Sequence, residues 1–462
     1  MGTKWLPDLS KAGRSKYKAL ADEIRAAVAG GQLASGAQLP PVREMAYQLQ
    51  VTPGTVARAY SLLTDEGVLQ AGVGRGTFVS EATTQVDDSV AWPQVLNLRS
   101  PLLPDVGQSL LLRDAMRATA DTMPAAEFLN YPVNHLDRRL DLPLRRALRR
   151  WMADLPIGNF TAEDIVLAHG AQNALTLVMQ TVLSGDNPAV AVETLTYPGF
   201  RRAAELCRAR VVGIPCDEDG PVVAELERAV REQGVQLFCT SSEVNNPTVR
   251  ATSPARRREI AALAERLGLH VLDDDCYAIG PHADESYHSL LPDLGWYVSS
   301  LSKSLTPALR VGYVVAPHSR VQDLARTAIY SFFGLSRPLT EMTLAFMSDP
   351  RMLSVEAKAR ARINELVRLT VNHLGGHNVT WQEDVPFLWV ALPAGWRSAS
   401  FVRAAEAQGV MVKSAEEFVL RDGRPPHAIR IAVNGQVDIA RYEAGIDQVR
   451  QLLDNPREEF TV

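Results

Sequence analysis

Short apolar runs alternate with helical segments over most of this chain, and this alternation constrains its fold more than any other feature. Strand-like runs occur in DIVLAH, NPAVAVE, VQLFCT, HVLDDD and WYVSS, and helical segments such as AQNALTLVMQTVL and SPARRREIAALAERLG lie between them. Strands that alternate with helices form βαβ units, which build a mostly parallel sheet. We therefore predict a large α/β domain with a mostly parallel central sheet over residues 105–335.

The pattern changes in the last third of the chain. A long charged helical segment, VEAKARARINELVRLTVNHLG, leads to strand-like FLWVALP, helical SASFVRAAEAQG and strand-like IRIAVN. These elements are too few for another doubly wound sheet and favour a mixed arrangement. We predict a smaller α+β subdomain over residues 336–462.

The first 80 residues show a third pattern. A helical segment from Ser15 to about Ala29 is followed by PVREMAYQLQ and, after a short turn, by a helix that Thr52 is suited to cap. Two short helices joined by so tight a turn are typical of helix-turn-helix, and the Gly-rich VLQAGVGRGTFV that follows resembles a two-stranded wing. We predict a winged helix-turn-helix over residues 12–80, and a linker over residues 81–104, where the periodicity is lost.

Charge and composition limit the class of protein. The net charge is -5, yet the first 80 residues carry nine Lys and Arg against six Asp and Glu, so the basic character lies in the predicted winged helix. The four cysteines lie far apart without metal-binding spacing, which favours reduced thiols over a zinc site or a disulfide framework. The absence of a long apolar run predicts a cytoplasmic protein without a membrane segment.

The predicted recognition helix supplies the candidate DNA contacts. Such a helix places its N-terminal residues near base edges, while the preceding helix and the wing hold phosphates. The glycines beside Arg75 allow a close approach to a minor groove or a phosphate. The predicted DNA-binding residues are Arg43, Thr52, Gly54, Thr55, Arg58, Arg75 and Gly76. The alternative is a small packing module whose arginines only face solvent.

This part of the chain resembles the GntR family of winged-helix regulators over about residues 15–80, through LPPVREMAYQLQVTPGTVARAYSLLTDEGVL and GRGTFV. The resemblance implies DNA contacts at Arg43, Thr52, Thr55 and the wing residues Arg75 and Gly76. The chain departs from the family at Pro53 and Ala57, where many relatives carry basic residues.

The segment SSLSKSLTPALRVGYVVAP, residues 299–317, carries the most chemical information. A lysine that binds a carbonyl must be held in place and easily deprotonated, and a doubly charged phosphate needs hydroxyls and an arginine. Lys303, Ser300, Ser302 and Arg310 supply these groups. A Ser-Lys-Ser loop taken alone is more often a solvated turn, so other segments must decide.

Further polar positions follow strand-like runs, at the edge where open α/β sheets bind ligands. Ala171 and Gln172 begin a helix, and the free N–H groups there favour an anion. Tyr197 is placed to stack on an aromatic cofactor. For each position an ordinary turn or a core residue is the alternative.

The acids Asp273–Asp275 lie in the same type of position. A pyridine nitrogen stays protonated only beside a carboxylate, and donors near the phenolic oxygen tune such a cofactor. Asp274 supplies the carboxylate, and Tyr277 and Asn246 supply the donors. A metal site is the alternative, but no His or second carboxylate group stands at ligand spacing, so we expect no metal.

Together these segments resemble the fold-type I enzymes of the aminotransferase class I/II family, which use pyridoxal 5'-phosphate (PLP), over about residues 105–455. The resemblance implies PLP on Lys303, with Asp274 beside the pyridine nitrogen, Tyr277 and Asn246 beside O3', and Tyr197 as the stacking ring. It implies a phosphate held by Ala171, Gln172, Ser300, Ser302 and Arg310, and an α-carboxylate clamped by Arg430. The chain departs from the family in NPTV, which lacks the glycine usual after NPT, and around Tyr131…Leu144-Arg145, where a further glycine is missing.

A GntR-like head on an aminotransferase-like body is the architecture of the MocR-type regulators, which this chain resembles over nearly its whole length. The resemblance implies a head-to-tail homodimer that binds double-stranded operator DNA and responds to PLP, or to an aldimine of PLP with an amino-acid or amine effector. Such a ligand regulates only if it binds two conformations unequally. The alternative is an active aminotransferase that carries an accessory DNA-binding domain.

Overall fold

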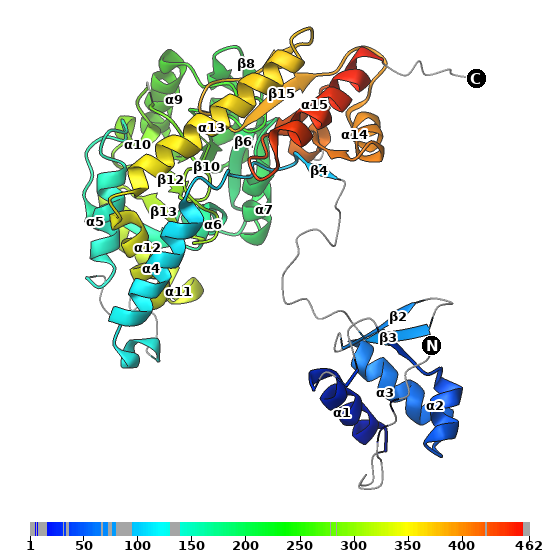
Figure 1. The fold of residues 1–462 in the computed structure, drawn as a ribbon. Coiled ribbons are helices and arrows are strands. Elements are labelled where there is room, and N and C mark those ends of the chain that lie inside the picture. The colour runs from blue at the N-terminus through cyan, green and yellow to red at the C-terminus, as the bar shows by residue number, and fades with distance from the viewer. Residues whose placement is uncertain are drawn as a thin grey trace. The chain divides into compact units, whose positions relative to one another are not determined.

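The computed structural model describes residues 5, 7, 16–30, 32–33, 37–65, 68–72, 76–79, 95–129, 139–277, 279–282, 284–420 and 423–455. The chain divides into two compact units, residues 1–93 and residues 94–462, which Figure 1 shows.

The N-terminal unit is a winged helix. It contains α1 (Lys16–Ala29), β1 (Gln38–Leu39), α2 (Val42–Gln48), α3 (Pro53–Asp65), β2 (Leu69–Gly72) and β3 (Gly76–Val79). The strands form an antiparallel sheet in the order β1-β3-β2. Leu20 and Ile24 of α1 pack with Val56, Tyr60 and Leu63 of α3 in its core. The predicted helix-turn-helix and hairpin are therefore confirmed as a fold.

A seven-stranded sheet forms the centre of the larger unit, in the order β5-β13-β12-β11-β10-β6-β7. Its strands are β5 (Ile165–Ala168), β6 (Ala189–Glu193), β7 (Arg210–Ile214), β10 (Val235–Thr240), β11 (His270–Asp274), β12 (Gly295–Ser300) and β13 (Gly312–Val315). All neighbours from β12 to β7 pair in parallel, and β13 is antiparallel to β12 and β5. The predicted mostly parallel sheet is confirmed.

Helices cover both faces of this sheet (Figure 1). One face packs against α6 (Gly170–Val182), α7 (Pro198–Leu206) and α11 (Val321–Phe332), and the other packs against α8 (Val223–Gln233), α9 (Pro254–Leu267) and α10 (Tyr287–Leu290). Along β6, Val190 and Val192 face the first group while Ala189 and Ala191 face the second. Strands buried on both faces explain why these segments read as continuous apolar runs.

The boundary between the large domain and the smaller subdomain lies later than residue 336, where the sequence pattern places it. The helix α12 (Arg337–Ser348) packs with α4 (Gln108–Thr122) and α5 (Leu142–Trp151) in the core of the large domain. The long helix α13 (Met352–His373) contributes Met352 to that core and Leu366 to the core of the smaller subdomain. The boundary was placed too early because an amphipathic pattern shows that a helix is buried on one side, but not which domain it packs against.

The smaller subdomain contains an antiparallel sheet in the order β14-β15-β18-β17. Its elements are β14 (Val379–Thr380), β15 (Phe387–Ala391), α14 (Ser398–Ala407), β16 (Val410–Met411), β17 (Lys413–Ser414), β18 (Ala428–Ala432) and α15 (Ile439–Asp454). The short elements β8 (Cys216–Asp217), β9 (Gly220–Pro221), η1 (Ala125–Phe128), η3 (Ala162–Asp164), η4 (His318–Arg320) and η5 (Ala415–Phe418) complete the larger unit.

Residues 95–104, which the sequence pattern assigns to the linker, are part of the smaller subdomain. Within them, β4 (Leu96–Asn97) pairs in parallel with β16. Leu96, Leu98 and Leu103 enter the core of the subdomain. Because this strand is so short, it leaves no periodic pattern by which the sequence alone reveals it.

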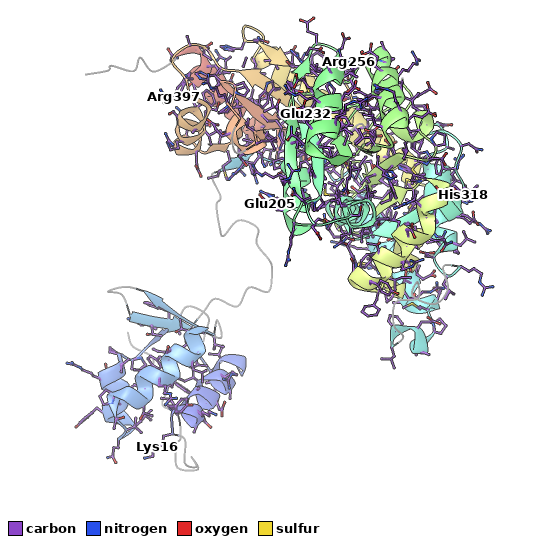
Figure 2. All side chains as sticks on the ribbon, turned by 180° about the vertical axis from the view of Figure 1, so that it is seen from behind. Lys16, Glu205, Glu232, Arg256, His318 and Arg397 are labelled. Atoms are coloured by element: carbon purple, nitrogen blue, oxygen red, sulfur yellow. The ribbon has the colours of Figure 1, made fainter. Side chains whose placement is uncertain are left out.

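Charged side chains lie mainly on the outside of both units. Lys16 of the N-terminal unit and Glu205, Glu232 and Arg397 of the larger unit are exposed, and they project from the ribbon in Figure 2. No helix in the described part of the chain is long and apolar enough to cross a lipid bilayer. Charged side chains that are buried in the larger unit are exceptions to this outward distribution, and each needs a local explanation.

Candidate functional site

A pocket of about 330 Å³ in the larger unit brings together all the predicted cofactor and effector residues. These are Ala171, Gln172, Tyr197, Asn246, Asp274, Tyr277, Ser300, Ser302, Lys303, Arg310 and Arg430. The pocket forms where parallel strands end, since β11 ends at Asp274 and β12 ends at Ser300. The carboxyl ends of parallel strands meet at one edge of a sheet, which is why side chains distant in sequence converge here.

Seven further described residues line the same pocket and were not predicted from the sequence: Ser100, Pro198, Arg202, Cys276, Pro307, Lys413 and Phe418. Pro198 and Cys276 are next to predicted site residues in the sequence, so they could have been predicted from these neighbours. Ser100 follows β4 by a few residues and Lys413 begins β17, and both strands are too short to be recognised in the sequence.

One end of the pocket is built for an anion. The helix α6 begins at Gly170, whose φ of 77° is in the left-handed region that favours glycine. A Cβ on Gly170 would lie 2.9 Å from an Arg310 guanidinium nitrogen, and one on Gly312 would lie 2.7 Å from the Ala171 nitrogen. The two glycines therefore let Arg310 and β13 approach the N-terminus of α6, where N–H groups are free.

The ring of Tyr197 is fixed beside this end of the pocket. Its hydroxyl donates to Oε1 of Gln172 at 3.0 Å, and Nε2 of Gln172 donates to the Gly199 carbonyl at 2.9 Å. A Cβ on Gly199 would lie 2.0 Å from the Tyr197 ring, so only glycine leaves room for it. Burial raises the pKa of Tyr197, which keeps the phenol protonated.

The three consecutive acids have three different environments. Asp273 accepts hydrogen bonds from the Ser242 nitrogen at 2.9 Å and from its hydroxyl at 2.7 Å. Asp275 accepts from the Tyr297 hydroxyl at 2.6 Å and pairs with His282. Asp274 faces the pocket, and its Oδ1 is buried without a hydrogen-bond partner among the described residues. Burial raises the pKa of Asp274 to about 7.

Arg430, on β18, is buried at the other end of the pocket. It donates to Oδ1 of Asn246 at 2.7 Å and to the Arg99 carbonyl at 2.5 Å, and its Nε has no partner among the described residues. No ion pair joins Arg430 to a carboxylate in the described part of the chain. Burial lowers the pKa of Arg430, because removing a cation from water is costly unless an anion accompanies it.

Lys303 lies in the turn that follows β12. The turn is closed by the Leu305 and Thr306 nitrogens, which donate to the Leu301 carbonyl at 3.0 and 2.9 Å. Leu301 and Leu305 are buried in the core of the large domain, so the turn is anchored on both sides of the lysine. The Nζ of Lys303 lies 5.5 Å from the centroid of the Tyr277 ring, within the pocket.

The chain departs from the aminotransferase pattern at Val249 and around Tyr131 and Arg145. Val249, which replaces the usual glycine after NPT, has a φ of 68°, so a β-branched residue takes the conformation that glycine adopts freely. Tyr131 lies outside the described residues. Arg145 is buried and pairs with Asp141 at 2.8 Å, and it donates to the Ala162 carbonyl at 2.9 Å, so it supports the fold of the large domain.

The predicted DNA-binding residues lie around the turn between α2 and α3. Thr52 caps α3, since its Oγ1 accepts from the Thr55 nitrogen at 3.3 Å. Arg43, Thr52 and Gly54 are exposed and Thr55 is half-buried. The exposed Arg58 lies 4.3 Å above the Tyr17 ring, so part of its role is to join α3 to α1. Gly76 begins β3, and Arg75 lies outside the described residues.

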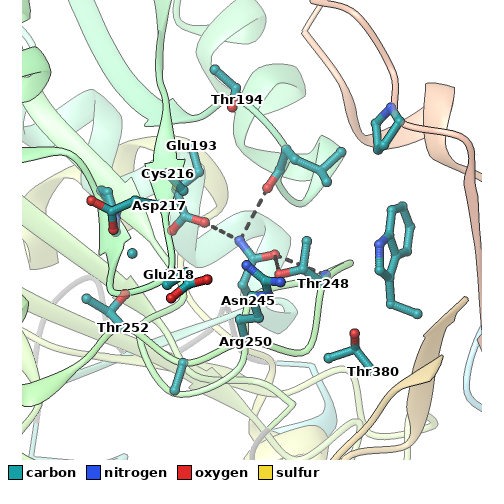
Figure 3. A pocket seen from close by; sticks show the side chains of 16 residues that line it. Glu193, Thr194, Cys216, Asp217, Glu218, Asn245, Thr248, Arg250, Thr252 and Thr380 are labelled. Atoms are coloured by element: carbon teal, nitrogen blue, oxygen red, sulfur yellow. Dashed lines mark hydrogen bonds between the residues drawn. The ribbon is translucent and has the colours of Figure 1, made fainter. Parts of the chain in front are cut away.

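A second pocket, of about 320 Å³, lies between the large domain and the smaller subdomain (Figure 3). Glu193 on its wall accepts hydrogen bonds from Thr240 and Asn245, and burial raises the pKa of Glu193 to about 7. Asp217 pairs with Arg256 at 3.0 Å. Glu193 and Asp217 therefore already have partners within the protein, and no residue of this pocket was predicted from the sequence as a site residue.

Comparison with known proteins places both units. Residues 93–449 match the family described as aminotransferase class I and II. This chain belongs to the aminotransferase class I and II family. Residues 16–79 match the gntR family of bacterial regulatory proteins, so this aminotransferase-family chain carries a GntR-type helix-turn-helix at its N-terminus. The combination agrees with the predicted MocR-type architecture.

Two curated relatives are named as HTH-type transcriptional regulators. YdeF of Bacillus subtilis (strain 168), named an uncharacterized HTH-type transcriptional regulator, is 28% identical over 98% of this chain and 97% of its own length. PdxR of Corynebacterium glutamicum, named an HTH-type pyridoxine biosynthesis transcriptional regulator, is 29% identical over 66% of this chain and 67% of its own length.

Solved structures resemble the fold of the larger unit. An archaeal alanine:glyoxylate aminotransferase has a TM-score of 0.68 at 20% identity, covering 87% of this chain and 95% of that protein. The kynurenine aminotransferase of Pyrococcus horikoshii, solved with PMP, has a TM-score of 0.67 at 21% identity, covering 78% of this chain and 91% of that protein. At these identities the likeness concerns the fold.

Proposed function

We propose that this chain is a PLP-dependent transcription regulator that binds operator DNA through its winged helix and responds to PLP and to an amino-acid or amine effector. The observation that carries the proposal is one pocket that holds Lys303, Asp274, Arg310 and Arg430, in a chain whose other unit is a GntR-type helix-turn-helix. A relative that matches 98% of this chain and another that matches 66% of it are named HTH-type transcriptional regulators. Action on operator DNA places the protein in the cytoplasm.

The residues of the pocket fit PLP. The buried, unpaired Oδ1 of Asp274 suits a protonated pyridine nitrogen, which would relieve the cost of burying this carboxyl group. The close approach of Arg310 to the start of α6 leaves guanidinium and backbone N–H donors for a phosphate, with Ser300 and Ser302 beside them. Tyr197 offers a ring face at the same place.

Each residue has a distinct task in this proposal. When bound, PLP supplies an electrophilic carbon for amines and a ring that withdraws electrons from them. Lys303 presents the amine that would hold the cofactor covalently, and Tyr277 and Asn246, which line the same pocket, would donate to the phenolic oxygen. Asp274 holds a proton at the ring nitrogen. Arg310, Ala171, Gln172, Ser300 and Ser302 orient the phosphate.

Arg430 would bind the α-carboxylate of an amino-acid effector. Among the described residues its guanidinium donates to neutral oxygens, those of Asn246 and of the Arg99 backbone, and it also interacts with the Tyr277 side chain. A carboxylate accepts two parallel hydrogen bonds from a guanidinium and neutralises its charge. An effector at Arg430 therefore competes with contacts to residue 99, which follows the junction between the two units at residues 93 and 94. This competition offers a route from the effector to the DNA-binding unit.

A head-to-tail homodimer fits the exposed apolar side chains of the larger unit. Monomeric proteins rarely expose large contiguous apolar patches. Eight exposed apolar side chains belong to α4, to the ends of α11 and α13, to the end of η1 or to the segment before α5: Leu110, Met116, Phe128, Leu129, Leu140, Tyr330, Phe333 and Leu353. We propose that a second copy of this chain covers them.

The cofactor part of the proposal is tested with Lys303→Ala. The wild-type protein mixed with PLP should develop a visible absorption band, and the variant should lack it while circular dichroism shows an unchanged fold. A band that persists in the variant would show that another lysine holds the cofactor. Many turnovers with amino acids and 2-oxoacids at ordinary enzyme rates would favour the active aminotransferase over the regulator.

The DNA part is tested with Arg43→Ala. Because Arg43 is exposed on α2, we expect it to contact a phosphate. The variant should bind a random-sequence duplex more weakly, with a salt slope lower by about 1 than that of the wild type. Arg397→Ala, on the surface of the larger unit, is the control (Figure 2). An unchanged slope for Arg43→Ala removes this residue from the interface.

A further inference from the structure

We infer that the effector is an amino acid with a second acidic group, and that Lys413 recognises this group. The inference rests on the amino-acid effector proposed above. The pocket has more positive charge than PLP and one α-carboxylate require. Among its described lining residues are the cations Arg202, Lys303, Arg310, Lys413 and Arg430, against the single carboxylate of Asp274.

The proposed ligands leave two of these cations unassigned. Lys303 and Arg310 serve the cofactor, and Arg430 serves the α-carboxylate. Arg202 and Lys413 remain, and both line the pocket. A cavity lined mainly by one sign of charge attracts ligands of the opposite sign.

Lys413 lies close to the residue that would hold the α-carboxylate. On the antiparallel strands β17 and β18, Lys413 is directly opposite Arg430. Residues opposite each other in such a pair have Cα atoms only about 5 Å apart, and their side chains lie on one face of the sheet. Like charges at this spacing are destabilising, and burial together with Arg430 lowers the pKa of Lys413.

The protein provides too little negative charge to balance this end of the pocket. The carboxylate of Glu417 lies 3.2 Å from Nζ of Lys413 and 3.6 Å from the guanidinium of Arg99. Arg430 adds a third cation, and its guanidinium donates to the carbonyl of Arg99. Three cations therefore surround one carboxylate, and one ligand carboxylate at Arg430 still leaves a positive excess.

A dicarboxylic amino acid matches this arrangement. With its α-carboxylate on Arg430, a short acidic side chain reaches Lys413 across the width of one strand pair. Arg202 belongs to α7, which begins beside Tyr197 and contacts Gln172 at the phosphate end of the pocket, so it is less suited to this task. Lys413 is thus a specificity residue.

The test compares acids with their amides, which differ in charge and hardly in shape. The PLP-loaded full-length protein is titrated with L-glutamate and L-glutamine, and with L-aspartate and L-asparagine, and binding is followed by absorption and by calorimetry. We expect at least one acid to bind about 10-fold or more tightly than its amide, as for a charge-assisted hydrogen bond. In Lys413→Gln this ratio should fall to about 1, with amide binding unchanged.

Control variants separate the possible outcomes. Arg368→Gln, which removes an exposed cation on α13 that pairs with Glu383, should keep the ratio. Equal binding of acids and amides by the wild type overturns this inference and leaves the proposed function intact. An acid-to-amide affinity ratio that is unchanged in Lys413→Gln, or that is lost only in Arg202→Gln, also overturns this inference and leaves the proposed function intact. A loaded protein that responds to none of these amino acids contradicts the proposed effector itself, and this inference with it.

Discussion

Residues that look equivalent in the sequence have different chemical roles in the fold. In Asp273, Asp274 and Asp275 the side chains alternate at the end of β11, so each meets a different environment. The first and third have hydrogen-bond donors from Ser242 and from Tyr297. The sequence predicted the pairing of Asp274 with a pyridine nitrogen from its place after a strand-like run and from a resemblance. The structure supports this pairing, because among the described lining residues Asp274 supplies the one carboxyl group of the pocket.

A pH prediction belongs to the neighbouring Asp275. Burial opposes the charged form of His282. The nearby carboxylates of Asp275 and Glu243 outweigh this effect of burial and raise the pKa of His282 to about 9. A group whose folded pKa is raised stabilises the protein below its unfolded pKa, and that stabilisation is lost as pH rises through the folded pKa. The free energy of unfolding should therefore fall by roughly 2 kcal/mol between about pH 7 and pH 9.

Urea unfolding at several pH values measures this loss. In His282→Gln the fall between pH 7 and pH 9 should largely disappear. His318→Gln changes an exposed histidine that pairs with Asp164, and it should retain the fall. The same pH dependence in wild type and in His282→Gln would contradict the assignment.

At the scale of elements, the N-terminus of α6 depends on the absence of a side chain. Gly170 and Gly185 both have positive φ values, 77° and 80°. A Cβ on Gly170 would collide with Arg310, whereas one on Gly185 would meet nothing within 4 Å. The two positions therefore separate backbone strain from damage to the predicted phosphate site.

Gly170→Ala should weaken PLP binding about 10-fold or more, because the methyl group displaces the Arg310 guanidinium from the phosphate. Gly185→Ala should lose similar backbone stability, about 1 kcal/mol, with unchanged PLP affinity. Absorption titration with PLP and thermal unfolding measure the two effects. Equal PLP affinities in the two variants would mean that the start of α6 does not hold the phosphate.

At the scale of the whole molecule, the exposed apolar side chains predict self-association. Met116 on α4 is 54% exposed and Leu206 on α7 is 74% exposed, but only Met116 belongs to the group of helices proposed as the interface. Met116→Lys should raise the dimer dissociation constant about 10-fold or more, since a buried lysine without a partner is costly at an interface.

Leu206→Lys is the matched control, and it should leave association unchanged. Sedimentation velocity of the full-length chain at several concentrations measures both variants. A dimer that tolerates Met116→Lys and dissociates in Leu206→Lys would move the interface to another face.

Local patterns predicted the element types and the two-unit division, because apolar periodicity and turn residues act over a few positions. They also predicted the residues of the pocket, since strand ends in a parallel sheet meet at one edge. Domain limits at residues 104 and 336 were misplaced, because the packing of β4 and α12 depends on distant partners.

Local sequence patterns are sufficient to predict that Lys303 follows a strand beside hydroxyls and an arginine, and that a helix-turn-helix precedes it. Which buried polar atoms lack partners depends on the tertiary structure. Oδ1 of Asp274 and Nε of Arg430 are buried without a hydrogen-bond partner among the described residues, and Lys413 lies across a strand pair from Arg430. These facts depend on contacts between segments far apart in the chain, and burial gives each unpaired charge its energetic cost.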